Sequence, residues 1–195
     1  MATKKRKPAP ARKKTAARAV KKAPAKARAT VQPVGPCLWF DNEAEAAAKF
    51  YVSVFRKGKI KQVSRYPDAG QEIHHRPAGS VLTVDFELNG TPFMALNGGP
   101  MPQFKFNEGI SFVVTCANQK EVDYYWERLG EGGDPRAQQC GWLKDKFGVS
   151  WQIVPEGMIR MLKDYKSPRT VRAFTAMMEM KKLDIAALEA AYAGQ

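Results

Sequence analysis

The chain has 195 residues, 44% of them hydrophobic, and a formal net charge of +13, so its length suffices for one or two domains. No apolar run approaches the roughly 20 residues of a membrane-spanning helix, and the N-terminus lacks the apolar stretch of a secretory signal, so we expect no membrane partner. The three cysteines form no Cys-x-x-Cys pair, which disfavours a disulfide scaffold and indicates the reducing environment of the cytoplasm.

Residues 1–32 consist almost wholly of Ala, Lys, Arg and Pro, and they predict a disordered basic tail. They hold twelve basic residues and no acidic ones, whereas residues 33–195 hold 20 basic and 19 acidic residues. The composition resembles the tails of linker histones and implies non-specific DNA binding by counterion release, with association with the nucleoid. A solubilising extension without a partner stays open. The expected DNA-binding residues are Lys4, Lys5, Arg6, Lys7, Arg12, Lys13, Lys14, Arg18, Lys21, Lys22, Lys26 and Arg28.

The next segment, residues 33–100, predicts a strand, a helix and three further strands. Apolar residues recur at helical spacing after Asp41 and Asn42, either of which is a suitable N-cap. Apolar and polar residues alternate over residues 80–88, and Asn89-Gly90 is a two-residue hairpin signal. The expected elements are a strand at 37–41, a helix at 43–55, and strands at 59–66, 80–88 and 91–96.

The same order recurs in residues 105–156. Asn118 begins the helix of this second copy, with Glu121 three residues later as in a capping box. The expected elements are a strand at 110–116, a helix at 118–129, and strands at 136–141, 141–146 and 149–155. A C-terminal helical extension is expected over residues 157–164 and 168–192, and it carries an apolar stripe of Ile185, Leu188 and Tyr192. We interpret this stripe as a clasp in a homodimer.

Two copies of βαβββ resemble the vicinal oxygen chelate, or glyoxalase-like, superfamily. The chain is similar to its PhnB-like branch, often labelled 3-demethylubiquinone-9 3-methyltransferase, in LWFDNEAEAAAKFYVSVF, FMALNGGP, CGWLKDKFGVSWQIVP and AMMEMKKLDIAALEAAY. The resemblance implies an α+β fold in which two βαβββ modules form a curved-sheet cavity. The expected domains are the tail at 1–32 and a glyoxalase-like domain at 33–195, with modules at about 33–100 and 105–156 and C-terminal helices at 157–193.

Active members of the superfamily hold a divalent metal with His and Glu from the first and last strand of each module. The matching positions here are Gly35 to Cys37, Met94 or Ala95, Ser111 and Gln152. None is a strong ligand for a transition metal, and one amide oxygen cannot hold zinc or iron. His74 and His75 are adjacent, and consecutive residues of an extended chain point opposite ways, so they are a poor chelate. We therefore predict no metal and no cofactor.

The methyltransferase label finds little support in the residues. A common S-adenosylmethionine site needs a Gly-rich turn that leads from a strand into a helix. Asn97-Gly98-Gly99-Pro100 follows a strand, but Pro100 and Pro102 disfavour a helix there. Cys140 is interpreted as a structural thiol, with a nucleophile as the alternative, because no His is near it in sequence.

Strand alternation sorts the side chains into two sets. Leu38, Phe40, Phe112, Val114, Trp151 and Ile153 are expected to pack under the helices. The predicted cavity residues are Cys37, Trp39, Asp85, Ser111, Ser150 and Gln152. We thus predict a metal-free protein that binds an unidentified small molecule. One alternative is an enzyme of unknown reaction in which Gln152 or Asp85 orients the substrate. Another is a nucleoid-associated DNA-binding protein whose body serves for dimerisation.

Overall fold

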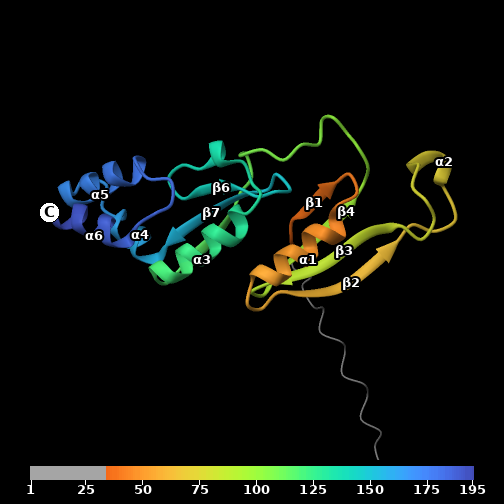
Figure 1. The fold of residues 1–195 in the computed structure, drawn as a ribbon, viewed down its shortest axis with the longest axis horizontal. Helices are drawn as coiled ribbons and strands as arrows, with labels where there is room; N and C mark the ends of the chain where they lie inside the picture. The colour runs from red at the N-terminus through yellow and green to blue at the C-terminus, as the bar shows by residue number, and fades with distance from the viewer. Residues whose placement is uncertain (1–33) are drawn as a thin grey trace, which may run out of the picture. The chain divides into compact units, whose positions relative to one another are not determined.

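The computed structural model describes residues 34–195 (Figure 1), so the predictions for the basic tail lie outside the described residues. The first module is a four-stranded sheet in the order β1-β4-β3-β2, in which β1 is parallel to β4 and the other pairs are antiparallel. Helix α1 packs on this sheet against β3 and β4 (Figure 1). Its elements are β1 (Cys37–Phe40), α1 (Ala44–Val54), β2 (Lys59–Arg65), β3 (Val81–Leu88) and β4 (Thr91–Asn97), with an unpredicted short helix α2 (Gln71–His74) before β3.

The second module has a three-stranded sheet in the order β5-β7-β6, with β5 parallel to β7. Its elements are β5 (Phe112–Cys116), α3 (Gln119–Gly130), β6 (Trp142–Lys144) and β7 (Ser150–Pro155). The strand predicted at 136–141 is wrong. Residues Pro135–Ala137 form a short 3-10 helix, because Asp134 accepts a bond from the Arg136 amide at 2.9 Å and Pro135 begins the turn. The one strand-like pairing of residues 136–141 is an isolated antiparallel β-bridge between Gln139 and Trp142. Apart from this strand, the predicted α+β fold of two repeated modules and C-terminal helices is confirmed.

The start of α1 differs from the prediction. Neither Asp41 nor Asn42 caps the helix; Glu43 occupies the N-cap position without a side-chain bond. The Ala44 amide instead donates to Oδ1 of the buried Asn97, at the end of β4, at 2.8 Å. A helix donor is thus satisfied from a distant part of the chain, which local sequence cannot reveal.

The prediction for α3 is confirmed. The side chain of Asn118 accepts a bond from the Glu121 amide at 3.1 Å. The two residues are only three positions apart in the chain, so the sequence alone predicts this cap.

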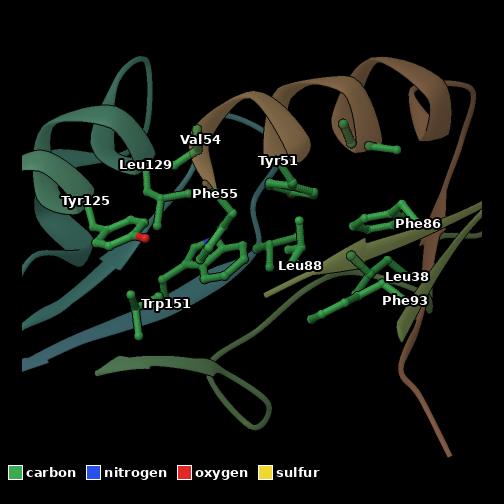
Figure 2. Close-up of a cluster of buried hydrophobic side chains, with 14 of the residues drawn as sticks. Leu38, Tyr51, Val54, Phe55, Phe86, Leu88, Phe93, Tyr125, Leu129 and Trp151 are labelled. Atoms are coloured by element: carbon green, nitrogen blue, oxygen red, sulfur yellow. The ribbon is translucent and has the colours of Figure 1, made fainter. Parts of the chain in front are cut away.

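One hydrophobic cluster includes side chains from both modules (Figure 2). Tyr51 of α1 is fully buried; its ring stacks on Phe86 of β3 at 6.1 Å and lies 5.4 Å from Trp151 of β7. Phe55 lies close to Trp151 and Tyr125 in the same cluster (Figure 2). Burial of large aromatic surfaces makes this cluster the main source of stability in the described chain.

Three helices follow the second module: α4 (Glu156–Met161), α5 (Pro168–Met178) and α6 (Ile185–Ala193). On α6, Leu188 is buried with Met177 and Leu183, and Ile185 packs against the main core. Two residues of the predicted dimer stripe therefore contact their own chain, and a homodimer stays a prediction. Within residues 34–195, no helix is both long and apolar enough to span a membrane.

Candidate functional site

Strand alternation divides the two faces of each sheet as expected. Leu38, Phe40, Val114, Trp151 and Ile153 are buried on the helix-covered side. The β5–β7 register pairs Val113 with Gln152 and Phe112 with Trp151, so Gln152 lies on the opposite face from Trp151. The open faces of the two sheets are therefore where the predicted ligand-binding side chains lie.

On the first sheet, Cys37 and Asp85 share one row of the open face. Cys37 pairs with Met94 of β4, and Met94 pairs with Asp85 of β3. The pKa of the Cys37 thiol lies above its usual value, mainly because the thiol is partly buried and secondly because the Asp85 carboxylate is near. A thiol with a raised pKa is protonated at neutral pH, so Cys37 is neither an activated nucleophile nor a ready metal ligand.

Cys37 also lines a cavity of about 280 Å³ together with Ser150 of β7. Phe106, Ile110 and Phe112 form part of its apolar wall. Ser150 is 2% exposed, and its hydroxyl is the one buried side-chain polar atom of residues 34–195 without a hydrogen-bond partner. The structure thus brings two of the six predicted residues together across the modules.

Gln152 lies in a second, larger cavity of about 650 Å³ between the open face of β6 and β7 and helices α4 and α5. Its amide Nε2 donates to the Ser111 hydroxyl at 2.9 Å, which brings two more predicted residues together and orients the amide. We call this cavity the methionine-lined pocket; its lining includes Trp142, Gln152, Val154, Met158, Met177 and Met178. The three methionines were not predicted, because nothing local in the sequence shows where the C-terminal helices dock.

Cys140 lies at the edge of the methionine-lined pocket in a left-handed backbone conformation, with φ of 51°. Its backbone amide donates to the Met180 carbonyl at 2.8 Å. Its Sγ lies 3.8 Å from Met178 Sδ and 3.5 Å from Nε2 of the Gln139 side chain. These neighbours include no general base, which favours a structural role over a nucleophilic one.

The residues at the superfamily's metal positions do not fit a divalent metal. Within residues 34–195, no three side chains of His, Cys, Asp or Glu come together in a way that could hold an ion. In the loop before β3, Nδ1 of His74 accepts a bond from the Arg76 amide at 3.0 Å, so Nε2 donates to the Ala69 carbonyl at 3.1 Å. Both nitrogens of His74 are therefore used in holding the loop.

Trp39 lies apart from the other predicted residues. It lines a third cavity of about 480 Å³ near the loop after β4, and its indole nitrogen donates to the Gly99 carbonyl at 3.0 Å. Asp85 lines a hollow of about 290 Å³ beside Glu87 and Met94. Five of the six predicted residues thus line four separate cavities of the described chain, and Ser111 lines none of these four.

Comparison with known proteins shows that this domain is similar to one protein family. The model of the 3-demethylubiquinone-9 3-methyltransferase family matches residues 32–154. A PhnB protein from Bacillus cereus, described as a 3-demethylubiquinone-9 3-methyltransferase, is 33% identical, with 64% of this chain and 99% of that chain covered and a TM-score of 0.54.

Two further solved structures are more distant. A protein from Pseudomonas aeruginosa is 18% identical over 65% of this chain and 98% of that chain, with a TM-score of 0.49. A glyoxalase/bleomycin resistance protein from Albidiferax ferrireducens is 12% identical over 63% of this chain and 96% of that chain, with a TM-score of 0.37. No curated protein matches the chain.

Proposed function

The chain belongs to the 3-demethylubiquinone-9 3-methyltransferase family of PhnB-like proteins. From this premise we propose that it binds a small organic molecule in the methionine-lined pocket without a bound metal ion. The observation that carries the proposal is that Gln152, a predicted site residue whose amide is oriented by its bond to Ser111, lines a cavity of about 650 Å³. Cavities of this size are typical of small-molecule sites.

The chemistry of the lining suggests what kind of molecule fits. Methionine side chains are flexible and polarisable, so they adapt to apolar ligands of irregular shape. Nε2 of Gln152 donates one of its two N–H groups to Ser111, so the amide oxygen and the second N–H are left to bond a ligand. The guanidinium of Arg136, also in the lining, is paired with Asp134 at 2.9 Å. We therefore expect a mostly apolar ligand with one polar group that forms hydrogen bonds.

Binding of the fluorescent probe 8-anilinonaphthalene-1-sulfonate tests the pocket. Met178 lines it, whereas Phe174, four residues earlier on α5, does not, and the two are 49% and 48% exposed. Met178→Glu should weaken probe binding about tenfold or more, because it places a charge in an apolar wall. Phe174→Glu adds the same charge and should leave binding nearly unchanged. Equal effects of the two substitutions would place the probe elsewhere and contradict the proposal.

An enzymatic role is the alternative, with Gln152 or Asp85 orienting a substrate. The family name implies methyl transfer, but the Asn97–Pro100 turn ends β4 and the next helix begins only at Gln119. That turn therefore lacks the strand-to-helix geometry of a common S-adenosylmethionine site. Saturable binding of S-adenosylmethionine to the purified chain would favour the enzyme; no binding at millimolar concentration would oppose it.

For the N-terminal tail we propose non-specific DNA binding. The support is its charge alone: twelve cations and no anions in 32 residues, beside a body with a net charge of +1. Such a segment gains affinity for duplex DNA from counterion release.

A further inference from the structure

The side chain of Trp39 is held in place by several contacts. Its indole nitrogen donates to the Gly99 carbonyl at 3.0 Å, and the ring of Phe104 stands edge-on to it with centroids 4.8 Å apart. A β-carbon on Gly98 would collide with the indole ring. Gly98 therefore provides the space in which the Trp39 ring lies, and Gly99 supplies the carbonyl that holds it.

The cavity beside Trp39 combines aromatic rings with carboxylates. Trp39, Phe104, Phe106 and Phe147 contribute to its wall, and Asp41 and Glu43 lie at its edge. Its volume of about 480 Å³ exceeds what a small organic ion needs. This cavity is separate from the methionine-lined pocket, with which it shares no lining residue.

The charges around this cavity are unevenly paired. Within residues 34–195 the structure gives no ion pair to Asp41 or Glu43. The cation of Lys144 is paired with Glu108 at 2.5 Å. Arg76 donates to the Asp41 backbone carbonyl oxygen, which holds its charged guanidinium beside Asp41, although Arg76 does not line the cavity. Lys105 is the remaining cation in the lining.

We propose that this cavity binds an organic ammonium ion that carries methyl groups, beyond the function proposed above. The faces of aromatic rings attract cations, and Trp is the most effective of them. Phe147 already shows this preference, since the Lys146 ammonium lies 5.5 Å from its centroid and 4.2 Å from that of Phe50. A quaternary ammonium has no N–H donor and so needs no hydrogen-bond acceptor, and the Asp41 and Glu43 carboxylates supply the opposite charge.

Choline and its uncharged isostere 3,3-dimethyl-1-butanol form a matched pair of probes for isothermal titration of the full chain. Choline should bind, and the alcohol, which has the same shape without the charge, should bind at least tenfold more weakly. The double variant Asp41→Asn/Glu43→Gln should weaken choline binding about fivefold or more. Lys105→Gln should strengthen it, because a repelling cation is removed.

Two aromatic variants complete the experiment. Trp39→Ala should abolish choline binding, and Trp142→Phe, which lies in the methionine-lined pocket and not in this cavity, should leave choline binding unchanged. If Trp39→Ala does not fold, the probe pair and the carboxylate variant still decide. Equal binding of the alcohol and choline, unchanged choline affinity in the carboxylate variant, or no choline binding at all by the wild type would each overturn the proposal without bearing on the methionine-lined pocket.

Discussion

The hydroxyl of Tyr51 in the first module donates to Oδ2 of Asp145 in the second at 2.9 Å, in a buried position. The same carboxylate accepts bonds from the Trp151 indole at 2.8 Å and from the amides of Phe147 and Val149 at 2.8 and 3.0 Å. Burial, and next the Asp145 charge, raise the pKa of Tyr51 well above its usual value, so its hydroxyl stays protonated and donates. Four donors converge on one carboxylate with no cation partner among them.

The first prediction concerns this carboxylate. Asp145→Asn replaces one acceptor oxygen by an NH₂ group that faces donors, so roughly 2–5 kcal/mol of unfolding free energy should be lost. Tyr51→Phe removes a single donor and should cost about 1–2 kcal/mol. Urea unfolding of both variants measures the two losses. If Tyr51→Phe cost as much as Asp145→Asn, the convergence on Asp145 would not be the source of stability.

The second prediction concerns Asn97, which caps α1 from outside the helix. Oδ1 accepts from the Ala44 amide at 2.8 Å, and Nδ2 donates to the Val81 carbonyl at 3.1 Å. Asn97→Ala should cost about 2 kcal/mol or more, because both buried groups lose their partner. Asn97→Asp keeps the acceptor at the positive end of the helix but turns a buried carboxylate oxygen toward the Val81 carbonyl, so it should cost a similar amount. Thermal unfolding measures both losses; a loss below about 0.5 kcal/mol for Asn97→Ala would mean that Asn97 does not cap α1.

The predictable features of this fold depend on neighbours in the chain. The capping of α3 by Asn118 and the two-sided strands at Leu38–Phe40 and Trp151–Ile153 follow from spacing alone. The cap of α1 by Asn97 and the methionines around Gln152 depend on contacts between segments far apart in sequence. The predicted strand at 136–141 is absent because Asp134-Pro135 favours a turn that strand propensity does not register.

The positions of the candidate site residues were also only partly predictable from the sequence. The face of the sheet on which Cys37, Ser150 and Gln152 lie followed from alternation, because register determines it. Alternation does not predict that these residues line different cavities. That outcome depends on where the loop after β4 and helices α4 and α5 lie against the sheets. Alternation predicts that Trp39 faces the cavity, but its contact with Gly98 depends on a segment far away in the sequence.

The third prediction compares two glycines. A β-carbon on Gly133 would collide with the Lys144 carbonyl oxygen, whereas one on Gly157 in α4 would meet only the Arg160 guanidinium at 4.0 Å. Gly133→Ala should therefore destabilise the chain by about 2 kcal/mol or more, because backbone must shift. Gly157→Ala should stabilise it by up to about 1 kcal/mol through helix propensity. The change in melting temperature should have opposite signs for the two; loss of stability in both would contradict the packing described.

The fourth prediction concerns the Cys37 thiol, whose pKa is raised first by burial and next by the Asp85 carboxylate. Asp85→Asn removes the negative charge, so the pKa of Cys37 should fall and its alkylation by iodoacetamide at pH 8 should speed up several-fold. The midpoint of the rate against pH should move to lower pH, and the limiting rate at high pH should stay nearly the same.

Cys116 is the internal control for that experiment. It is fully buried, and burial raises the pKa of its thiol to about 12. It should resist alkylation in the wild type and in Asp85→Asn alike, as mass spectrometry of the modified peptides can show. An unchanged Cys37 profile in the variant would mean that Asp85 does not act on the thiol.

The last prediction concerns the tail, with twelve cations and no anions in residues 1–32. The full chain should bind duplex DNA with a dissociation constant of about 1 μM or weaker and with little sequence preference, because the contacts are to phosphates. A plot of the logarithm of affinity against the logarithm of salt concentration should have a slope of about −0.9 per phosphate contacted, and thus no steeper than about −11.

A chain that begins at Pro33 has a net charge of +1 and should bind DNA far more weakly. Equal affinities and slopes for the two chains would rule out a DNA-binding tail, and a slope near zero for the full chain would leave a solubilising extension. Discrimination between sequences by more than about tenfold would instead indicate base recognition by the body.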